Sequence, residues 1–275
     1  MLRLTAASRQ QALAEMIGAG TGITISDVAE SYGVSTETIR RDLLQLEKNG
    51  LIKRVHGGAM PVGREAPVAL RMQENAVEKR RIAKLVPPLL TTDQWVFITG
   101  GSTTLEVAKE LSYGPSLSVL TNMPAIAEAL QGPARHKVVL TGGEYASEDG
   151  ALIGSQVLDA IDECVFDASI IGVYGFDESY GLLEAEKYYQ RLKQRIVARS
   201  RKAIFVADRS KFGSSGKYCS VPLDRIGTLV TDAAPPASLA ARLREAGVRT
   251  IHHEVARRQE ADAPEHTGME GGQND

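Results

Sequence analysis

The chain has 275 residues, of which 43% are hydrophobic and 24% charged, which is usual for a globular protein with room for a small module and one larger domain. Its formal net charge is only −2, so no protein-wide positive field attracts nucleic acid, and such binding would need a local basic patch. Its two cysteines, Cys164 and Cys219, lie far apart without a CxxC pair, which argues against a disulfide framework or a zinc site, and we expect no cofactor.

The N-terminal segment and the apolar runs give no sign of export or membrane insertion. Residues 1–17 carry charges among the apolar positions and have no apolar core of the kind found in signal peptides. No apolar run approaches the ~20 residues that are needed to cross a bilayer. We therefore expect a cytoplasmic protein without a membrane partner.

Two short helices are predicted at the start of the chain. The first is expected over residues 8–19, with Ser8 as its cap and apolar side chains at helical spacing. The second is expected from Ser26, as its cap, through Tyr32, and Gly33 then ends it.

A third helix and a hairpin complete a module over residues 1–60. Ser35 is a typical cap, and the helix should run to about Lys48, where Asn49-Gly50 gives a stop signal. Residues 51–56 suit a strand or hairpin because apolar and basic residues alternate there.

The third helix has one apolar side. At 100° per residue, Leu43 and Leu46 fall within about 40° of Ile39 and form a stripe that should be buried. Its other sides and its N-terminal end are polar, with Ser35, Thr36, Glu37, Thr38, Arg40, Arg41 and Gln45. Such a helix fits the major groove of double-stranded DNA, where the leading residues meet base edges and arginine pairs with guanine. The second and third helices therefore predict a helix-turn-helix.

The hairpin after this helix would form a basic wing. Lys53, Arg54 and His56 would neutralise phosphates, and Ser26 on the preceding helix is a further predicted DNA contact. The alternative is an amphipathic surface helix whose arginines are merely solvated, and the Arg-Arg pair alone favours it. The complete order of cap, turn, amphipathic helix and basic hairpin favours DNA binding.

The pattern changes after this module. Residues 61–75 carry two prolines and little periodicity, and they predict a linker. From residue 76 to 252, apolar runs rich in β-branched residues alternate with helical segments, which predicts an α/β fold with a mostly parallel sheet. The expected strands are 95–99, 117–121, 137–141, 168–174, 202–207 and 227–231. Residues 253–275 are polar and acidic, and we expect a disordered tail.

The loop "TGGSTT" (99–104) is the most informative part of the larger domain, because ligands of parallel sheets bind at the carboxyl ends of strands. Gly100 and Gly101 allow close approach to a ligand. The hydroxyls of Ser102, Thr103 and Thr104 stand where the next helix begins, so they can receive a phosphate. The alternative is a plain turn with a helix cap. The loop matches neither a Walker loop nor GxGxxG, which argues against nucleotide binding.

A lysine follows another strand end. Lys211 comes shortly after Asp208 and would supply a cation to the same phosphate, although a solvent-facing loop lysine is the commoner case. The same alternatives hold for Arg191 and Lys193 in a downstream helix.

Motifs in both parts of the chain resemble one family over roughly residues 5–250. They are Arg9, Leu13 and Ile17 at four-residue spacing, "STETIRRDL", "RVHGGA", "VFITGGSTTLEVAKEL", "VLTNMPAIAEAL", "VVLTGGE" and "VADRSKFG". With them the chain is similar to the DeoR-type bacterial transcription regulators. The resemblance implies an N-terminal winged helix-turn-helix that reads DNA with residues 35–41, and a C-terminal effector domain similar in fold to sugar-phosphate isomerases and acyl-CoA transferases.

The resemblance also implies a phosphorylated sugar, or a polyol phosphate like glycerol 3-phosphate, as the effector. It would bind near the loop of Gly100 and Gly101, at Ser102, Thr103, Thr104, Asn122, Gly143, Lys193 and Lys211. Thr99 stands where the family often has an aspartate, so an acidic contact to the ligand is missing or comes from elsewhere.

These features predict a DNA-binding regulator that represses a carbohydrate or polyol catabolic operon until the effector releases it from DNA. The release requires that the effector bind the two states with different affinity. A homo-oligomer, either dimer or tetramer, would place paired reading heads on repeated half-sites. The alternative is a sugar-phosphate isomerase that carries a DNA-binding module. It would need a positioned general base, and the available carboxylates, Glu144, Glu184, Glu186 and Asp208, form no recognisable catalytic arrangement.

Overall fold

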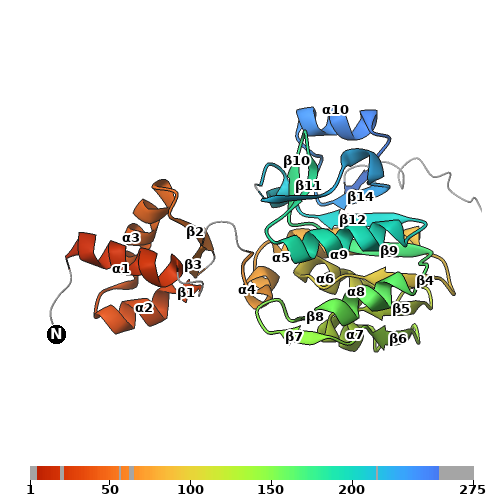
Figure 1. The fold of residues 1–275 in the computed structure, drawn as a ribbon, viewed down its shortest axis with the longest axis horizontal. Coiled ribbons are helices and arrows are strands. Elements are labelled where there is room, and N and C mark those ends of the chain that lie inside the picture. Colours follow the sequence, from red (N-terminus) through yellow and green to blue (C-terminus); the bar gives the residue numbers. More distant parts are fainter. Residues whose placement is uncertain (1–4, 19–21, 56, 62–64, 215, 254–275) are drawn as a thin grey trace, which may run out of the picture.

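The computed structural model describes residues 5–18, 22–55, 57–61, 65–214 and 216–253, except for the side chains of Lys53 and Val55. Figure 1 shows a small N-terminal head, in red and orange, beside a larger α/β body that the chain enters at α4. His56, and the predicted tail beyond His253, lie outside the described residues.

The head consists of short helices and a three-stranded antiparallel sheet. Its elements are α1 (Ala6–Gly18), β1 (Ile23–Thr24), α2 (Ile25–Tyr32), α3 (Thr36–Lys48), β2 (Ile52–Val55) and β3 (Gly58–Pro61). Strand β3 lies between β1 and β2 and pairs with both. This arrangement confirms the predicted winged helix-turn-helix, in which β2 and β3 form the wing.

The ends of two helices differ from the prediction, which placed their caps at Ser8 and Ser26. Helix α1 begins two residues earlier, and the backbone N–H of Ser8 donates to Thr5 Oγ1 at 3.2 Å. The cap of α2 is Thr24, which has an extended backbone and accepts from Asp27 N at 3.3 Å, whereas Ser26 lies inside the first turn. Where two hydroxyl residues stand close together, the one with the non-helical backbone takes the cap.

The turn into α3 is as predicted. Gly33 has the left-handed φ of 62° that ends α2, and its N–H donates to carbonyls of the last turn. Ser35 is extended and accepts from the N–H of Thr38 at 3.2 Å, so it caps α3. Both residues fix the angle between the two helices.

The body contains a seven-stranded sheet in which every neighbouring pair is parallel. In order across the sheet the strands are β15 (Arg249–His252), β14 (Thr228–Thr231), β12 (Ala203–Ala207), β9 (Ala168–Gly172), β4 (Trp95–Ile98), β5 (Ser118–Thr121) and β6 (Lys137–Leu140). All six expected strands are present, shortened by one or two residues at their ends. Strand β15 was not predicted.

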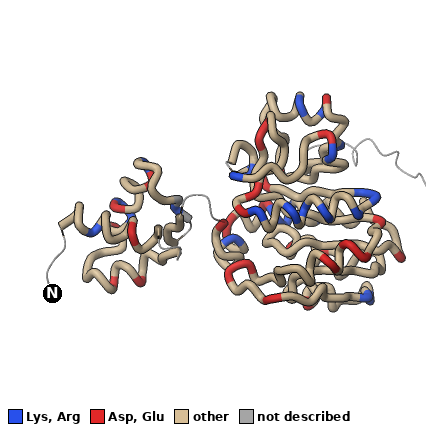
Figure 2. Tube along the Cα trace, in the orientation of Figure 1, with Lys and Arg blue, Asp and Glu red and all other residues tan. Residues whose placement is uncertain are grey.

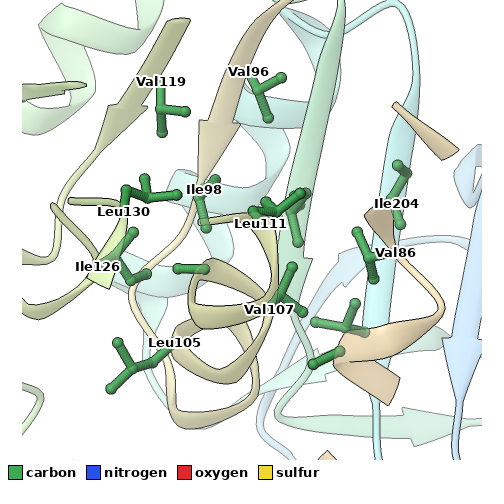
Figure 3. Packing of buried hydrophobic residues seen from close by; sticks show 14 of the residues in the cluster. Val86, Val96, Ile98, Leu105, Val107, Leu111, Val119, Ile126, Leu130 and Ile204 are labelled. Carbon is green, nitrogen blue, oxygen red and sulfur yellow. The ribbon is translucent and has the colours of Figure 1, made fainter. Parts of the chain in front are cut away.

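Helices cover both faces of this sheet, which explains why its strands are continuous apolar runs. They are α5 (Ala76–Lys84), α6 (Ser102–Leu111) and α7 (Pro124–Ala129) on one face and α8 (Ser155–Asp162), α9 (Lys187–Ala198) and α10 (Ala237–Glu245) on the other. Each face of the sheet has its own hydrophobic core, and alternate residues of β4 point into one or the other. Val96 and Ile98 pack with Leu111 on one face, as Figure 3 shows, and Phe97 packs with Leu192 on the opposite face. The parallel α/β architecture is therefore confirmed.

Smaller elements surround the carboxyl ends of the strands. They are the antiparallel β10 (Gly175–Asp177), β11 (Gly181–Glu184) and β13 (Tyr218–Val221), the pair β7 (Glu144–Ala146) and β8 (Ala151–Ile153), and the 3-10 turns at Pro87–Leu89, Arg209–Lys211 and Leu223–Arg225. Within the predicted linker, α4 (Val68–Gln73) packs on the body: Val68 is 8% exposed and its N–H donates to Glu148 O at 2.7 Å. Over the ranges that the structure describes, no helix combines the length and hydropathy needed to span a bilayer.

Candidate functional site

The outer face of α3 is the first candidate site. Ile39 and Leu43 are completely buried, and the side chains of Arg40 and Arg41 are 58% and 79% exposed. The predicted orientation is therefore correct: the apolar stripe faces the core of the head and the two arginines face outward. A helix held in this way by its packed side has its polar face available to a DNA groove.

One carboxylate bridges both arginines. Glu37 lies 3.7 Å from Arg40 Nη1 and 3.5 Å from Arg41 Nε, and its side chain is 59% exposed. Exposed pairs of this kind contribute about 0–1 kcal/mol, so both arginines can leave Glu37 for DNA at little cost.

The other predicted DNA contacts whose side chains are described belong to α2, α3 and the cap of α3. Ser26, Ser35, Thr36 and Gln45 are exposed and Thr38 is half-buried. The hydroxyls of Ser35 and Thr38 lie 2.9 Å apart, and Gln45 Nε2 donates to Asn49 Oδ1 at 3.3 Å.

The wing is tied to α3 by a salt bridge. Arg54 Nε lies 2.7 Å from Glu47 Oε2, and the backbone N–H of Arg54 donates to Glu47 Oε1 at 3.0 Å. The hydrogen bond from the Arg54 side chain lowers the pKa of Glu47. The predicted contacts Lys53 and His56 lie outside the described side chains. Figure 2 shows Lys, Arg, Asp and Glu positions interspersed on the head, so any preference for DNA must come from the local arrangement.

The second candidate site is a cavity at the carboxyl ends of the central strands, with a volume of about 60 Å³. A water molecule needs roughly 10–15 Å³ of such a volume, so the cavity has space for several water-sized groups. It is lined by Glu65, Arg71, Thr99, Gly100, Gly101, Ser102, Thr103, Asn122, Asp149, Ala151, Gly172, Val173, Tyr174, Glu184, Tyr189, Leu192, Lys193 and Lys211. Seven of the predicted effector contacts thus meet here, although they come from strand ends and helices far apart in sequence.

The "TGGSTT" loop forms one wall of this cavity. The N–H of Gly100 donates to Asn122 Oδ1 at 2.8 Å, and the Asn122 amide donates to Leu152 O at 3.0 Å, which fixes the loop against the next strand. A Cβ at Gly100 would lie 3.0 Å from Ala151 Cβ, so the close approach favours glycine. Among the described residues no side chain caps the N-terminus of α6, and its first N–H groups remain available to an anion.

Two predicted effector contacts are not in the lining. Thr104 is fully buried, and its hydroxyl donates to Gly101 O at 3.0 Å, so it stabilises the loop conformation without facing the cavity. Gly143 has a φ of 117° beside β8, where a Cβ would come within 2.6 Å of Ile153 O. Thr99, at the position where the family often has an aspartate, does line the cavity, and its hydroxyl accepts from Gly172 N at 3.0 Å.

Four charged residues of the cavity were not predicted as effector contacts: Glu65, Arg71, Asp149 and Glu184. Lys193 forms a buried salt bridge with Glu184, which also accepts from Ser220 Oγ at 3.3 Å. Burial raises the pKa of Glu184, and Lys193 opposes that rise. The hydroxyl of Tyr189 donates to Asp149, and its pKa is raised first by burial and then by Asp149.

Two further charged side chains come from the segment that connects the head to the body. Arg71 Nη1 lies 3.1 Å from Glu65 Oε1, and Lys211 Nζ lies 3.8 Å from the same oxygen. The sequence does not single them out, since residues 61–75 also carry the charged residues Arg64 and Glu74. Their partner Lys211 is more than a hundred residues away, so only the fold identifies the cluster.

Comparisons with known proteins match both parts of the chain. A family model described as "DeoR-like helix-turn-helix domain" matches residues 9–63, and one described as "DeoR C terminal sensor domain" matches residues 74–233. The chain is 33% identical over 247 residues to the glycerol-3-phosphate regulon repressor of Escherichia coli (strain K12), covering 89% of this chain and 96% of that protein. It is also 33% identical over 248 residues to the HTH-type transcriptional regulator GlpR of Haloferax volcanii, covering 89% of this chain and 97% of that protein.

Among solved structures, ribose 5-phosphate isomerase A from Methanocaldococcus jannaschii matches 50% of this chain and 55% of its own, with 14% identity and a TM-score of 0.36. This similarity is too low to carry an argument about activity.

Proposed function

The chain belongs to the DeoR family of DNA-binding transcriptional regulators, and from this premise we propose that it represses a carbohydrate or polyol catabolic operon until a phosphorylated sugar or polyol releases it. The observation that carries the proposal is the presence, in one chain, of an outward arginine face on α3 and a cavity where cations meet the N-terminus of α6. Membership in this family makes the protein a regulator rather than an isomerase.

The proposed division of the chain follows from these two sites. Residues 1–60 bind operator DNA, residues 76–252 sense the effector, and residues 61–75 connect them. The names of the relatives make glycerol 3-phosphate the first effector to test.

The function can be tested with DNA selected by the full-length protein from a random-sequence pool. We expect selection of a repeated or inverted half-site, and release of that DNA in a gel shift by glycerol 3-phosphate or a sugar phosphate but not by the unphosphorylated compounds. Failure to select any sequence would contradict DNA reading, and retention of the DNA with every phosphorylated compound would contradict the effector class.

Substitutions in the cavity should separate sensing from DNA binding. Lys211→Ala or Thr103→Ala is expected to leave affinity for the selected DNA within about twofold of the original, because neither residue lies in the head, while the effector concentration for release rises at least about tenfold as one charge-assisted contact is lost. The measurement is a gel shift titrated with effector. Lys187→Ala, an exposed lysine of α9 outside the cavity lining, is the control. A normal response of both cavity variants would place the effector elsewhere.

Substitutions at the salt bridge of the wing should change DNA affinity without changing sequence preference. Arg54→Ala should weaken binding to all sequences alike and reduce the salt slope by about one, since it removes a phosphate contact. Glu47→Gln should have the opposite effect, because it frees Arg54 from its 2.7 Å partner. Fluorescence anisotropy with selected and random duplexes over a salt series measures both. An Arg54→Ala effect confined to the selected sequence would argue against the phosphate contact.

We also propose that the protein works as a homo-oligomer, either a dimer or a tetramer. The edge strand β6 supports this, because Val139 and Leu140 are 39% and 43% exposed there, and Tyr145 in β7, the next strand in the sequence, is 58% exposed. An edge strand with exposed apolar side chains is a surface on which a second chain can pair.

A further inference from the structure

The charges of the effector cavity are already compensated without a ligand. Among the described lining residues, the cations are Arg71, Lys193 and Lys211, and the carboxylates are Glu65, Asp149 and Glu184. An incoming phosphate brings its own negative charge into a partly buried site, where uncompensated like charges are costly. Phosphate binding at the cations therefore requires that one carboxylate leave its partners.

Two of the three carboxylates are held by buried partners, so a phosphate cannot readily displace them. The Glu184 side chain is 4% exposed and is bonded to Lys193 and Ser220. Asp149 accepts a hydrogen bond from the hydroxyl of the largely buried Tyr189. Moving either carboxylate away would leave its buried partner without that interaction, which costs free energy.

Glu65 is the exception. Its side chain is 28% exposed, and it lies on the irregular segment before α4 rather than on the sheet. Its contacts with Arg71 and Lys211 are 3.1 Å and 3.8 Å long, and both cations approach the same atom, Oε1. Two cations that converge on one oxygen form the arrangement that also receives an oxygen of a phosphate.

The same arginine holds the segment in place. Arg71 Nε donates to Ala66 O at 2.7 Å, next to Glu65 in the chain. From Val68 onward the segment is anchored independently by the bond to Glu148 O and by Lys79, which donates to Glu74 O at 2.7 Å and to Arg71 O. Loss of Arg71 would therefore remove one contact from each of residues 65 and 66, whereas the contacts that anchor α4 would remain. Pro61, which ends the wing strand β3, lies four positions before Glu65 in the sequence.

We propose that Glu65 is an internal competitor for the effector: its carboxylate occupies the Arg71 and Lys211 cations in the free protein, and the effector's phosphate displaces it. The displacement of Glu65 removes its two ion pairs with the body and so loosens the connection between body and wing, which couples effector binding to DNA release. The inference rests on the proposed function, because it presumes a phosphorylated ligand in this cavity.

The test is the affinity of full-length Glu65→Gln for inorganic phosphate and glycerol 3-phosphate, measured by thermal shift and calorimetry. Glutamine keeps the shape but removes the competing charge, so the half-saturating concentration of both probes should fall about tenfold. Glu65→Asp keeps a carboxylate and should remain within about threefold of the original protein. Glu186→Gln is the matched control, since Glu186 is an exposed carboxylate at the start of α9 that is absent from this cavity's lining.

In a gel shift with the selected DNA, Glu65→Gln should be released by correspondingly less glycerol 3-phosphate. If the original protein binds the probes and Glu65→Gln binds no more tightly, or Glu186→Gln tightens binding equally, the competitor role is wrong while the proposed function stands. If neither the original protein nor Glu65→Gln binds any phosphorylated probe, the proposed effector cavity fails, and the competitor role fails with it.

Discussion

Arg41→Ala is expected to abolish sequence-specific DNA binding and to leave the head folded. The Arg41 side chain is 79% exposed and its only partner among the described residues is Glu37, which is 59% exposed, so its loss costs the fold almost nothing. A bidentate arginine–guanine contact discriminates by about 1–3 kcal/mol. In the proposed homo-oligomer, two heads on one operator would each lose this contact. The affinity would then fall by roughly 30-fold or more.

Anisotropy titrations with the selected site and with a random duplex measure the effect. Binding to the random duplex should fall much less, because only one charge is lost. Arg244→Ala, on the exposed side of the distant α10, is the control for the change of net charge. Unchanged discrimination by Arg41→Ala would exclude this face of α3 as the reading surface.

Asp42→Ala is expected to unfold the head while the body stays folded. Asp42 accepts from Arg9 Nε at 2.5 Å and from Gln10 Nε2 at 2.9 Å, which joins α3 to α1, and the Arg9 and Asp42 side chains are only 9% and 6% exposed. Removing one partner of a buried ion pair costs about 3–5 kcal/mol. A domain of this size has little more stability than that.

Calorimetry of the full chain should then show loss of one transition and retention of the one from the body. The double variant Arg9→Met, Asp42→Leu is the control: it removes both charges together, so it should recover most of the stability. If Asp42→Ala melts like the original protein, the pair is not a structural link between the two helices.

Much of the head was predictable because its signals are local. The spacing of Ile39, Leu43 and Leu46 fixes which side of α3 is buried, and Gly33 and Ser35 fix where it begins. In the body, the apolar runs predicted six strands for the same reason: a strand covered on both faces has no polar alternation. The strand ends moved by one or two residues, and the caps of α1 and α2 lie three and two residues before the predicted ones.

What escaped prediction depends on contacts between distant residues. Strand β15 starts with Arg249 and has partly exposed side chains, so its sequence lacks the apolar run of a central strand. Helix α4 has six residues, and its place is set by Val68 in the core and by Lys79 rather than by its own periodicity. The carboxylates of the cavity belong to loops and to β11, and no spacing in the sequence relates Glu65 to Lys211.

The carboxylate of Glu37 beside Arg40 and Arg41 has a consequence for how the regulator searches a genome. A negative charge at the leading end of the reading helix is repelled by the sugar–phosphate backbone of any duplex. It offsets part of the attraction that the two arginines have for any duplex, whereas their direct bonds to matching bases add to the affinity only at the target site. Chromosomal DNA presents about 10⁶–10⁹ competing non-specific sites. Weak binding of the head to these sites leaves a larger fraction of the regulator molecules available to bind the operator.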